Sequence, residues 1–181
     1  MLGYCLVATA FGPVGLAWND TGILRAQLPG SDGEATRQLL RRGLQGAVET
    51  DPPDWLEATV TRLQRYFTGT PVDLSTSPLD LSGVPEFNRR LYEEMLKLRW
   101  GETVTYGELA TRVGAAGASQ SVGRAMGQNP VPIIIPCHRV LASGNRLGGF
   151  SAPGGTRTKL RMLEMEGVWV GAAPGQMAFA F

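Results

Sequence analysis

The chain has only two cysteines and a single histidine among its 181 residues. Cys5 and Cys137 lie far apart in the sequence, which is not the pattern of a disulfide framework, so we expect a reducing intracellular setting and a free thiol at Cys137. A structural zinc site needs four ligands at short, paired spacings. One histidine and two distant cysteines cannot supply them, so the sequence predicts no metal site.

Long apolar runs and an excess of one charge are also missing. No stretch reaches the roughly 18 apolar residues of a membrane span, and the start, "MLGYCLVATAFGPVGLAW", lacks the basic segment of a signal peptide. We therefore expect a cytoplasmic protein without membrane contact. The net charge is only +1, so any surface for nucleic acid must be local. Hydrophobic residues at 43% predict a folded chain, compact but with room for two lobes.

The N-terminal part predicts a small sheet with helices. Residues 3–28 form short β-rich runs broken by "GP" and "NDTG", which is typical of a three-stranded antiparallel meander. Cys5 lies in the first run, as a small buried hydrophobe. Residues 33–44 fit a short surface helix. Residues 54–69 predict a longer helix with Asp54 and Glu57 as a capping pair and Gly69 at its end. Its apolar face comprises Trp55, Leu56, Thr59, Val60, Leu63, Tyr66 and Phe67.

A Pro- and Ser-containing passage, "TGTPVDLSTSPLDLSGVP", then indicates a linker between two lobes. We place an N-terminal domain at residues 1–77 and a C-terminal domain at 78–181. Together these patterns predict an α/β protein.

The C-terminal domain begins with helical patterns. Residues 85–101 predict a helix that starts after Pro85 and stops before Gly101. Thr105 and Glu108 form a capping box that begins a helix at Tyr106, and "SQSVGRAMGQNP" is a second short helix, so the pair predicts a helix-turn-helix.

The second of these helices is rich in small residues: Ser121, Gly123, Ala125 and Gly127. Glycine is unfavourable inside a helix by about 1 kcal/mol, so something must come close to it. Tight packing against another helix and entry into a narrow groove of nucleic acid both explain the pattern. Composition does not separate the two.

The segment "NPVPIIIPCHRV" carries the clearest chemical signal. Val131 to Ile135 is short, β-branched and bounded by prolines, which predicts a buried strand or extended segment. Pro136 ends it and leaves Cys137 at the edge of the core. A lone cysteine is usually an inert core residue. The adjacent His138, the only histidine in the chain, favours a reactive thiolate instead.

The motif "IPCHRV", preceded by Asn129-Pro130, closely resembles the active-site motif of the O6-alkylguanine-DNA alkyltransferases. "GETVTYGELA" is similar to that family's entry into its helix-turn-helix, "GGFSAPGG" to its loop over the alkylguanine pocket, and "TKLRMLEMEG" to its closing helix. The resemblance covers residues 78–168 with specific motifs, and residues 1–77 only by a compatible pattern. It implies a ribonuclease H-like N-terminal domain and a mainly helical C-terminal lobe with a winged-helix-like helix-turn-helix.

The resemblance also implies the chemistry. The Cys137 thiolate attacks the alkyl carbon on O6 of a guanine flipped out of double-stranded DNA, and O4-alkylthymine reacts less readily. The thioether is permanent, so each chain reacts once, as a monomer and without a cofactor. His138 removes the thiol proton through a water molecule, and Glu166 orients and supports the imidazole. Glu166 rather than Glu164 matches the family's Glu-Gly ending, although helical phase does not separate them.

Further roles follow from the same resemblance. Asn129 matches a hinge that ties the helix-turn-helix to the active-site segment. Tyr106 matches the residue that assists flipping and donates a proton toward the guanine. The carbonyls of Cys137 and Val140 correspond to groups that recognise the guanine amine, and the Ser151 amide to a donor for O6. The expected DNA- and substrate-binding residues are Gln120, Arg124, Val140, Ser143, Phe150 and Ser151.

Two positions depart from the family pattern. Gln120, fourteen residues after Tyr106, stands where the family usually has an arginine that fills the base stack. Arg124, one turn further on, would contact phosphate or share that role. Phe150 replaces a pocket tyrosine, and the segment from Cys137 to Glu166 is two residues longer, within "SAPGG".

Three functions of other classes remain as alternatives. A binder of alkylated bases would share the fold, but that related group lacks the reactive cysteine. A helix-turn-helix regulator would explain residues 105–129 but not "PCHRV". A cysteine hydrolase would use the same pair of residues and turn over. Mass spectrometry after incubation with alkylated DNA distinguishes these functions. An alkyltransferase gives one stable adduct on Cys137, a binder or regulator gives no adduct, and a hydrolase gives unmodified protein with released product.

Overall fold

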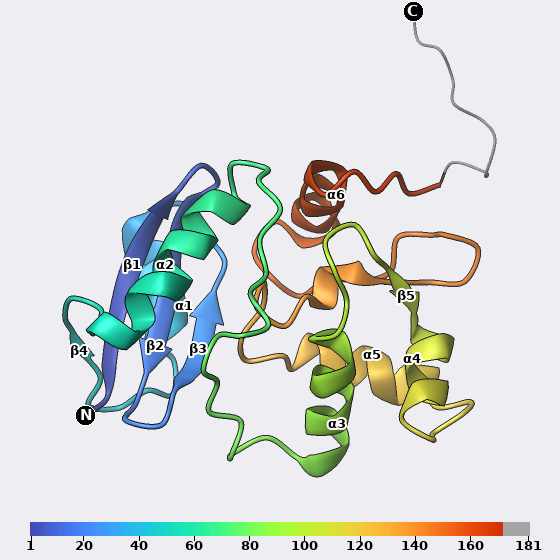
Figure 1. The fold of residues 1–181 in the computed structure, drawn as a ribbon, viewed down its shortest axis with the longest axis horizontal. Coiled ribbons are helices and arrows are strands. Elements are labelled where there is room, and N and C mark those ends of the chain that lie inside the picture. The colour runs from blue at the N-terminus through green and yellow to red at the C-terminus, as the bar shows by residue number, and fades with distance from the viewer. Residues whose placement is uncertain (172–181) are drawn as a thin grey trace, which may run out of the picture.

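The computed structural model describes residues 1–171, which form an N-terminal sheet lobe and a mainly helical C-terminal lobe side by side (Figure 1). The predicted meander is present, and a short strand joins it in parallel beside β1, giving the order β3-β2-β1-β4. The four strands are β1 (Gly3–Thr9), β2 (Gly12–Trp18), β3 (Ile23–Gln27) and β4 (Val48–Glu49). β4 was not predicted, because two exposed residues leave no pattern to detect.

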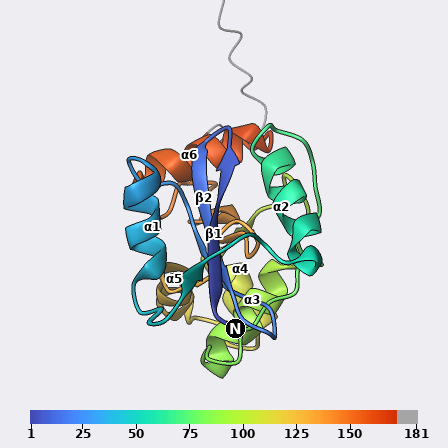
Figure 2. The same cartoon turned by 90° about the vertical axis from the view of Figure 1, so that its left-hand side faces the viewer.

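Helices α1 (Gly33–Arg41) and α2 (Asp54–Tyr66) cover opposite faces of this sheet (Figure 2). Side chains alternate between the two faces of a strand, and both faces of β1 are covered. On one face Tyr4 packs with Leu40 of α1. On the other face Cys5 and Val7 belong to the core that includes α2. Burial raises the pKa of the Cys5 thiol to about 11, helped by Asp51 and Glu49. Cys5 is therefore an inert core residue.

The start of α2 differs from the prediction. Pro53 stands at the N-cap, and no side chain caps the helix, so Asp54 and Glu57 act only as favourable charges in its first turn. Trp55 is 42% exposed rather than part of the apolar face. It lies one position outside the buried stripe that Leu56 begins.

The C-terminal lobe follows a linker that packs along β3. Ile23 N–H donates to the Pro78 carbonyl (2.9 Å), and Asp80 N–H donates to the Ile23 carbonyl (2.9 Å). The lobe contains α3 (Glu86–Met95), β5 (Val104–Thr105), α4 (Tyr106–Arg112), α5 (Ser119–Gly127), the 3₁₀ turn η1 (Cys137–Arg139), β6 (Val140–Leu141) and α6 (Gly155–Met165). β5 and β6 pair in parallel.

The helix-turn-helix begins as predicted. The Thr105 hydroxyl accepts from the Glu108 N–H at 3.2 Å, and the Glu108 carboxylate accepts from the Thr105 N–H at 2.7 Å. This reciprocal pair satisfies two backbone donors at the start of α4. α4 therefore starts at Tyr106, with that side chain in the first helical position.

One hydrophobic core runs through both lobes. It contains Val7 and Leu16 of the sheet, Leu63 of α2, Val122 of α5 and the segment before Cys137. The Ala26 N–H of β3 also donates to the Pro130 carbonyl (2.9 Å). The two lobes are therefore held together by shared apolar packing. None of the helices within residues 1–171 has the length and apolar character needed to cross a membrane.

Candidate active site

The isoleucine run is buried, as predicted, but it forms a tight turn rather than a strand or extended segment. Ile133 adopts a φ of 79°, and the Ile135 N–H donates to the Val131 carbonyl at 3.0 Å. Prolines 130, 132 and 136 remove the N–H donors that a strand would need, so the segment folds back on itself. A positive φ is unfavourable for a β-branched residue, and the surrounding contacts must hold it in place.

Asn129, at the end of α5, supplies two of those contacts. Its Nδ2 donates to the Ile135 carbonyl (2.8 Å), and its Oδ1 accepts from the Val131 N–H (3.0 Å). Because the prolines prevent a strand ladder here, these two bonds join the end of α5 to the segment that carries Cys137. Asn129 therefore ties the end of α5 to the segment before Cys137 by two side-chain hydrogen bonds.

Cys137 begins the 3₁₀ turn and is only 7% exposed. It lines two hollows of about 420 and 400 Å³. Burial raises the pKa of its thiol, while a hydrogen bond from Asn129 and the charge of Lys159 act in the opposite direction. The thiol is therefore protonated at rest and needs a base to become a nucleophile.

His138, completely buried, faces Glu166. Its Nε2 lies 2.8 Å from Glu166 Oε1. Arg139 donates from Nε to Glu166 Oε2 (2.8 Å), from Nη2 to Oε1 (3.1 Å) and from Nη1 to the Leu98 carbonyl (2.8 Å). Glu164 is exposed. The structure thus brings Glu166, and not Glu164, to the histidine.

The charge state of Glu166 fixes the tautomer of His138. Burial raises the pKa of Glu166, but His138 and Arg139 outweigh burial and lower it to about 2. The carboxylate can then only accept, so His138 Nε2 carries the hydrogen. His138 Nδ1 is buried without a hydrogen-bond partner among residues 1–171. Burial also lowers the pKa of His138, against the effect of Glu166. The result is a neutral imidazole whose Nδ1 keeps a free lone pair.

Three residues of this network were not predicted: Tyr66, Arg139 and Lys159. The Tyr66 hydroxyl donates to Glu166 Oε1 (2.6 Å) and lies 3.1 Å from His138 Nε2. Arg139 belongs to the "PCHRV" motif, which could have identified it. Tyr66 has no such signal, because its place on the apolar stripe of α2 indicates only packing.

Lys159 of α6 is buried and connects β6 to the loop that follows it. Its Nζ donates to the Val140 carbonyl (2.6 Å) and to the Gly149 carbonyl (3.3 Å). Burial lowers its pKa to about 8, against the effect of Cys137. Since that value lies above neutral pH, Lys159 remains mostly a cation near the thiol.

Tyr106, Phe150 and Ser151 line the 400 Å³ hollow together with Cys137. A Cβ at Gly148 would lie 2.6 Å from the Tyr106 hydroxyl, so only glycine lets the ring keep this position. The Ser151 hydroxyl donates to the Gly127 carbonyl at the end of α5 (3.2 Å). The pocket is therefore built between the helix-turn-helix and the loop that follows β6.

Gln120 and Arg124 are exposed on α5, and Arg124 Nη2 donates to the Ser121 hydroxyl (3.1 Å). A Cβ at Gly123 would meet Tyr106 at 3.9 Å, and one at Gly127 would meet Ser151 at the same distance, both ordinary contacts. Packing within the described chain does not require these glycines, which favours approach by another molecule. Ser143 is exposed in the loop after β6 and lines neither of the two Cys137 hollows.

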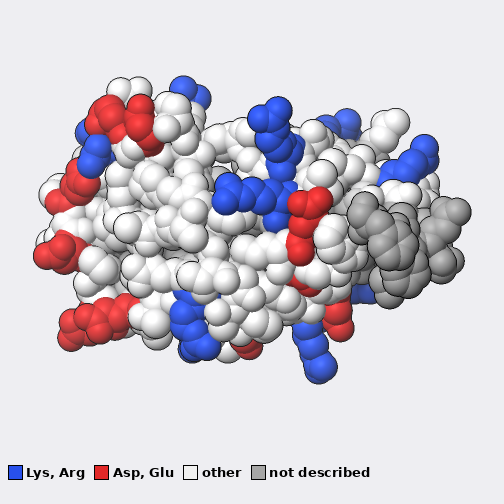
Figure 3. Space-filling model, turned by 90° about the horizontal axis from the view of Figure 1, so that it is seen from above, with Lys and Arg blue, Asp and Glu red and all other residues white. Residues whose placement is uncertain are grey.

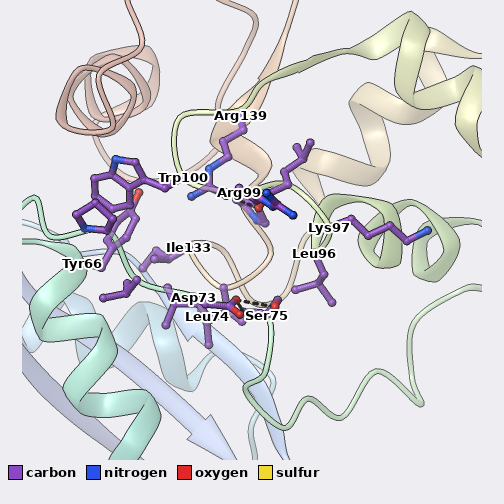
Figure 4. Close-up of a pocket in the computed structure, with 15 residues that line it drawn as sticks. Tyr66, Asp73, Leu74, Ser75, Leu96, Lys97, Arg99, Trp100, Ile133 and Arg139 are labelled. Atoms are coloured by element: carbon purple, nitrogen blue, oxygen red, sulfur yellow. Dashed lines mark hydrogen bonds between the residues drawn. The ribbon is translucent and has the colours of Figure 1, made fainter.

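The surface seen from above has no broad basic patch, because basic and acidic side chains are interspersed (Figure 3). Many of the acidic side chains lie at the end formed by the N-terminal lobe. A third hollow, of about 650 Å³, lies next to Tyr66, Trp100, Ile133 and Arg139 (Figure 4). It does not include Cys137, so size alone does not identify the reactive site.

Two family models match the chain. That of the 6-O-methylguanine DNA methyltransferase ribonuclease-like domain matches residues 2–81, and that of the DNA binding domain of the same family matches residues 86–168. The methylated-DNA–protein-cysteine methyltransferase of Methanothermobacter thermautotrophicus is 33% identical, covering 86% of this chain and 80% of the relative. That of Mycobacterium tuberculosis is 32% identical, covering 92% and 93%.

Solved structures agree. The crystal structure of Mycobacterium tuberculosis OGT in complex with DNA has a TM-score of 0.73 and 30% identity, covering 91% of this chain and 92% of that one. The O6-methylguanine-DNA methyltransferase from Pyrococcus kodakaraensis has a TM-score of 0.68 and 25% identity, covering 93% and 100%. The likeness therefore extends over both lobes.

Proposed function

The chain belongs to the 6-O-methylguanine DNA methyltransferase family, and we propose that its Cys137 takes the alkyl group from O6-alkylguanine in DNA. It is a methylated-DNA–protein-cysteine methyltransferase that repairs DNA by direct reversal. The observation that carries the assignment of Cys137 is that it lines a hollow and is followed in the chain by a neutral, buried His138 that Glu166 supports.

The reaction is a single displacement. His138 Nδ1 receives the thiol proton through one water molecule, and the sulfur forms a bond to the alkyl carbon as the bond from that carbon to O6 breaks. The electron pair of that bond passes to the guanine, toward which Tyr106 donates a proton. Burial raises the pKa of Tyr106, with a further effect of Cys137, which keeps its hydroxyl protonated as a donor. Tyr106 then regains a proton from the His138 imidazolium by way of solvent, so over the whole reaction the thiol proton replaces the alkyl group.

Backbone groups would recognise the base. The Cys137 carbonyl accepts from the Val140 N–H, and the Val140 carbonyl accepts from Lys159. Each carbonyl oxygen keeps a second lone pair for the guanine amine. The Ser151 amide would serve O6, and Phe150 would form a wall of the pocket. Ser143 would contact the DNA from its exposed loop.

The helix-turn-helix would hold the DNA. We assign residues 78–181 to DNA binding and transfer and residues 1–77 to the N-terminal domain, and we propose that the chain acts as a monomer in the cytoplasm. Small residues on α5 would let its backbone approach the minor groove, where Gln120 replaces the flipped base.

Mass spectrometry after incubation with a duplex containing O6-methylguanine tests the function. We expect one methyl group per chain, located on Cys137, and no further turnover. An unmodified protein with bound DNA would indicate a lesion binder or a regulator. An unmodified protein with released product would indicate a hydrolase.

Substitution of Gln120 should change the rate of alkyl transfer from duplex DNA but not from a free base. Gln120→Ala should slow repair of alkylated duplex about tenfold, because unstacking a base costs a few kcal/mol and the replacement is lost. Gln120→Arg should speed that repair, since a guanidinium stacks and is attracted by phosphate. Neither should change the rate with free O6-benzylguanine. The measurement is the ratio of the two rate constants for each variant.

Gln38→Ala is the matched control, because Gln38 is an exposed glutamine on α1. If both Gln120 variants changed the two rate constants equally, or changed neither, Gln120 would not be the residue that fills the stack.

A further inference from the structure

The N-terminal lobe contributes one polar atom to the buried network. Tyr66, the last residue of α2, is 1% exposed, and its hydroxyl donates to Glu166 Oε1 at 2.6 Å. Figure 4 shows Tyr66 and Arg139, which come from different lobes, among the residues that line the 650 Å³ hollow. The buried Tyr66 hydroxyl therefore contacts both His138, the proposed general base, and Glu166, the carboxylate that supports it.

We propose that Tyr66 is a positioning residue: its hydroxyl fixes the Glu166 carboxylate and takes up part of its charge, so that His138 remains a neutral base. The inference rests on the proposed function, because it concerns the group that removes the Cys137 proton. It adds that the N-terminal lobe completes the site rather than only supporting the fold.

The hydrogen-bond directions support this role. Glu166 Oε1 lies within hydrogen-bond distance of three donors: Tyr66 Oη at 2.6 Å, His138 Nε2 at 2.8 Å and Arg139 Nη2 at 3.1 Å. A carboxylate oxygen that is shared in this way offers less stabilisation to any one partner. Without the tyrosine donor, more of the negative charge would act on His138, and the imidazolium form would become more favourable.

The position of the Tyr66 ring is set by its neighbours. It makes edge contacts with Phe67 (ring centroids 5.0 Å apart) and Trp100 (5.4 Å). Burial raises the pKa of Tyr66, and Glu166 raises it further, so the hydroxyl is a permanent donor. Phenylalanine can keep the ring contacts while losing only the donor.

The charged or titratable groups that face His138 are Glu166, Arg139, Lys159, Cys137 and Tyr66. Burial, Arg139 and Lys159 oppose protonation of His138, whereas Glu166 favours it. Tyr66, like the protonated Cys137 thiol, is a neutral member of this set. Its removal therefore changes how the charge is shared without adding or removing a charge.

The single histidine makes the test direct. In protein labelled with ¹⁵N-histidine, the two imidazole nitrogen signals belong to His138 alone. We expect the Nε2–H tautomer in the wild type and in Tyr66→Phe, with the His138 pKa about half a unit to one unit higher in the variant. With free O6-benzylguanine, the fall of the rate constant at acid pH should move to higher pH by the same amount, because only neutral His138 can accept the thiol proton.

Tyr92→Phe is the matched control. Tyr92 is equally buried, and its hydroxyl donates to the Ala125 carbonyl (2.7 Å) rather than to Glu166. This variant should lose a similar amount of stability with no change in the His138 pKa. A Tyr66→Phe variant that loses stability but keeps both the wild-type His138 pKa and the wild-type pH profile would overturn the proposal.

Labelling with 3-fluorotyrosine gives a second measurement that does not depend on a variant. Fluorine makes the hydroxyl a stronger donor, so the His138 pKa should fall, and a rise or no change would contradict the role of Tyr66. These titrations require no alkyl transfer. A wild type that forms no adduct would therefore overturn the proposed function separately from the assignment of Tyr66.

Discussion

Replacing Cys137 with serine is expected to abolish alkyl transfer. Serine has nearly the same shape, so the 3₁₀ turn and the Asn129 contacts remain, but its hydroxyl is far less ionised than a thiol. The rate with alkylated duplex should fall by at least about a thousandfold. The variant should still fold and bind O6-methylguanine duplex, which a binding titration beside the transfer assay would measure.

Cys5→Ala provides the control for this result. Cys5 is buried in the N-terminal sheet, where burial raises the pKa of its thiol to about 11. Transfer should therefore continue, with one alkyl group per chain. Measurable transfer by Cys137→Ser would remove Cys137 from the role of nucleophile.

Glu166→Gln should have the second largest effect. The amide removes the charge that supports a protonated His138 and leaves the buried Arg139 without its ionic partner. Transfer should slow about a hundredfold, within the range of general acid–base catalysis. The apparent pKa of the Cys137 thiol should rise, as measured by the pH dependence of its alkylation by iodoacetamide.

Glu164→Gln is the matched control, two residues earlier and exposed. It should leave both the rate and the thiol pKa unchanged. If the alkylation profile of Glu166→Gln equalled that of the wild type, the link from Glu166 through His138 to the thiol would be wrong.

The same substitution should change how stability depends on pH. The pKa of Glu166 is lowered to about 2 from its ordinary value of 4.5. A lowered carboxylate pKa contributes stability above about pH 4.5, and that contribution is lost as the pH falls toward 2. Glu166→Gln should cost a few kcal/mol at pH 7, the range for breaking a buried ion pair. In urea unfolding, the difference in the free energy of unfolding between the wild type and Glu166→Gln should shrink as the pH falls from 4.5 to 3.

Patterns between near neighbours could be predicted well. The meander follows from the alternation and turn residues of 3–28, and the start of α4 follows from the capping box of Thr105 and Glu108. Cys137 and His138 are consecutive residues in the chain. These features depend on groups a few residues apart, so the sequence alone contains the information that decides them.

Apolar character alone did not decide other features. The isoleucine run looks like a strand, yet three prolines and the Asn129 side chain make it a turn. Trp55 is apolar, but α2 packs on the sheet one position away from it. Apolar character predicts burial in general, and only the contact between elements decides which residue is covered.

The reactive site shows the division most clearly. From its motifs the sequence determined the family, the nucleophile expected of it and the adjacent histidine. The tertiary structure decided that Glu166 rather than Glu164 meets His138, and that Tyr66, a hundred residues before Glu166, donates to the same oxygen. Such contacts form only after both lobes pack around one core, and no local pattern encodes the direction in which a buried hydroxyl will point.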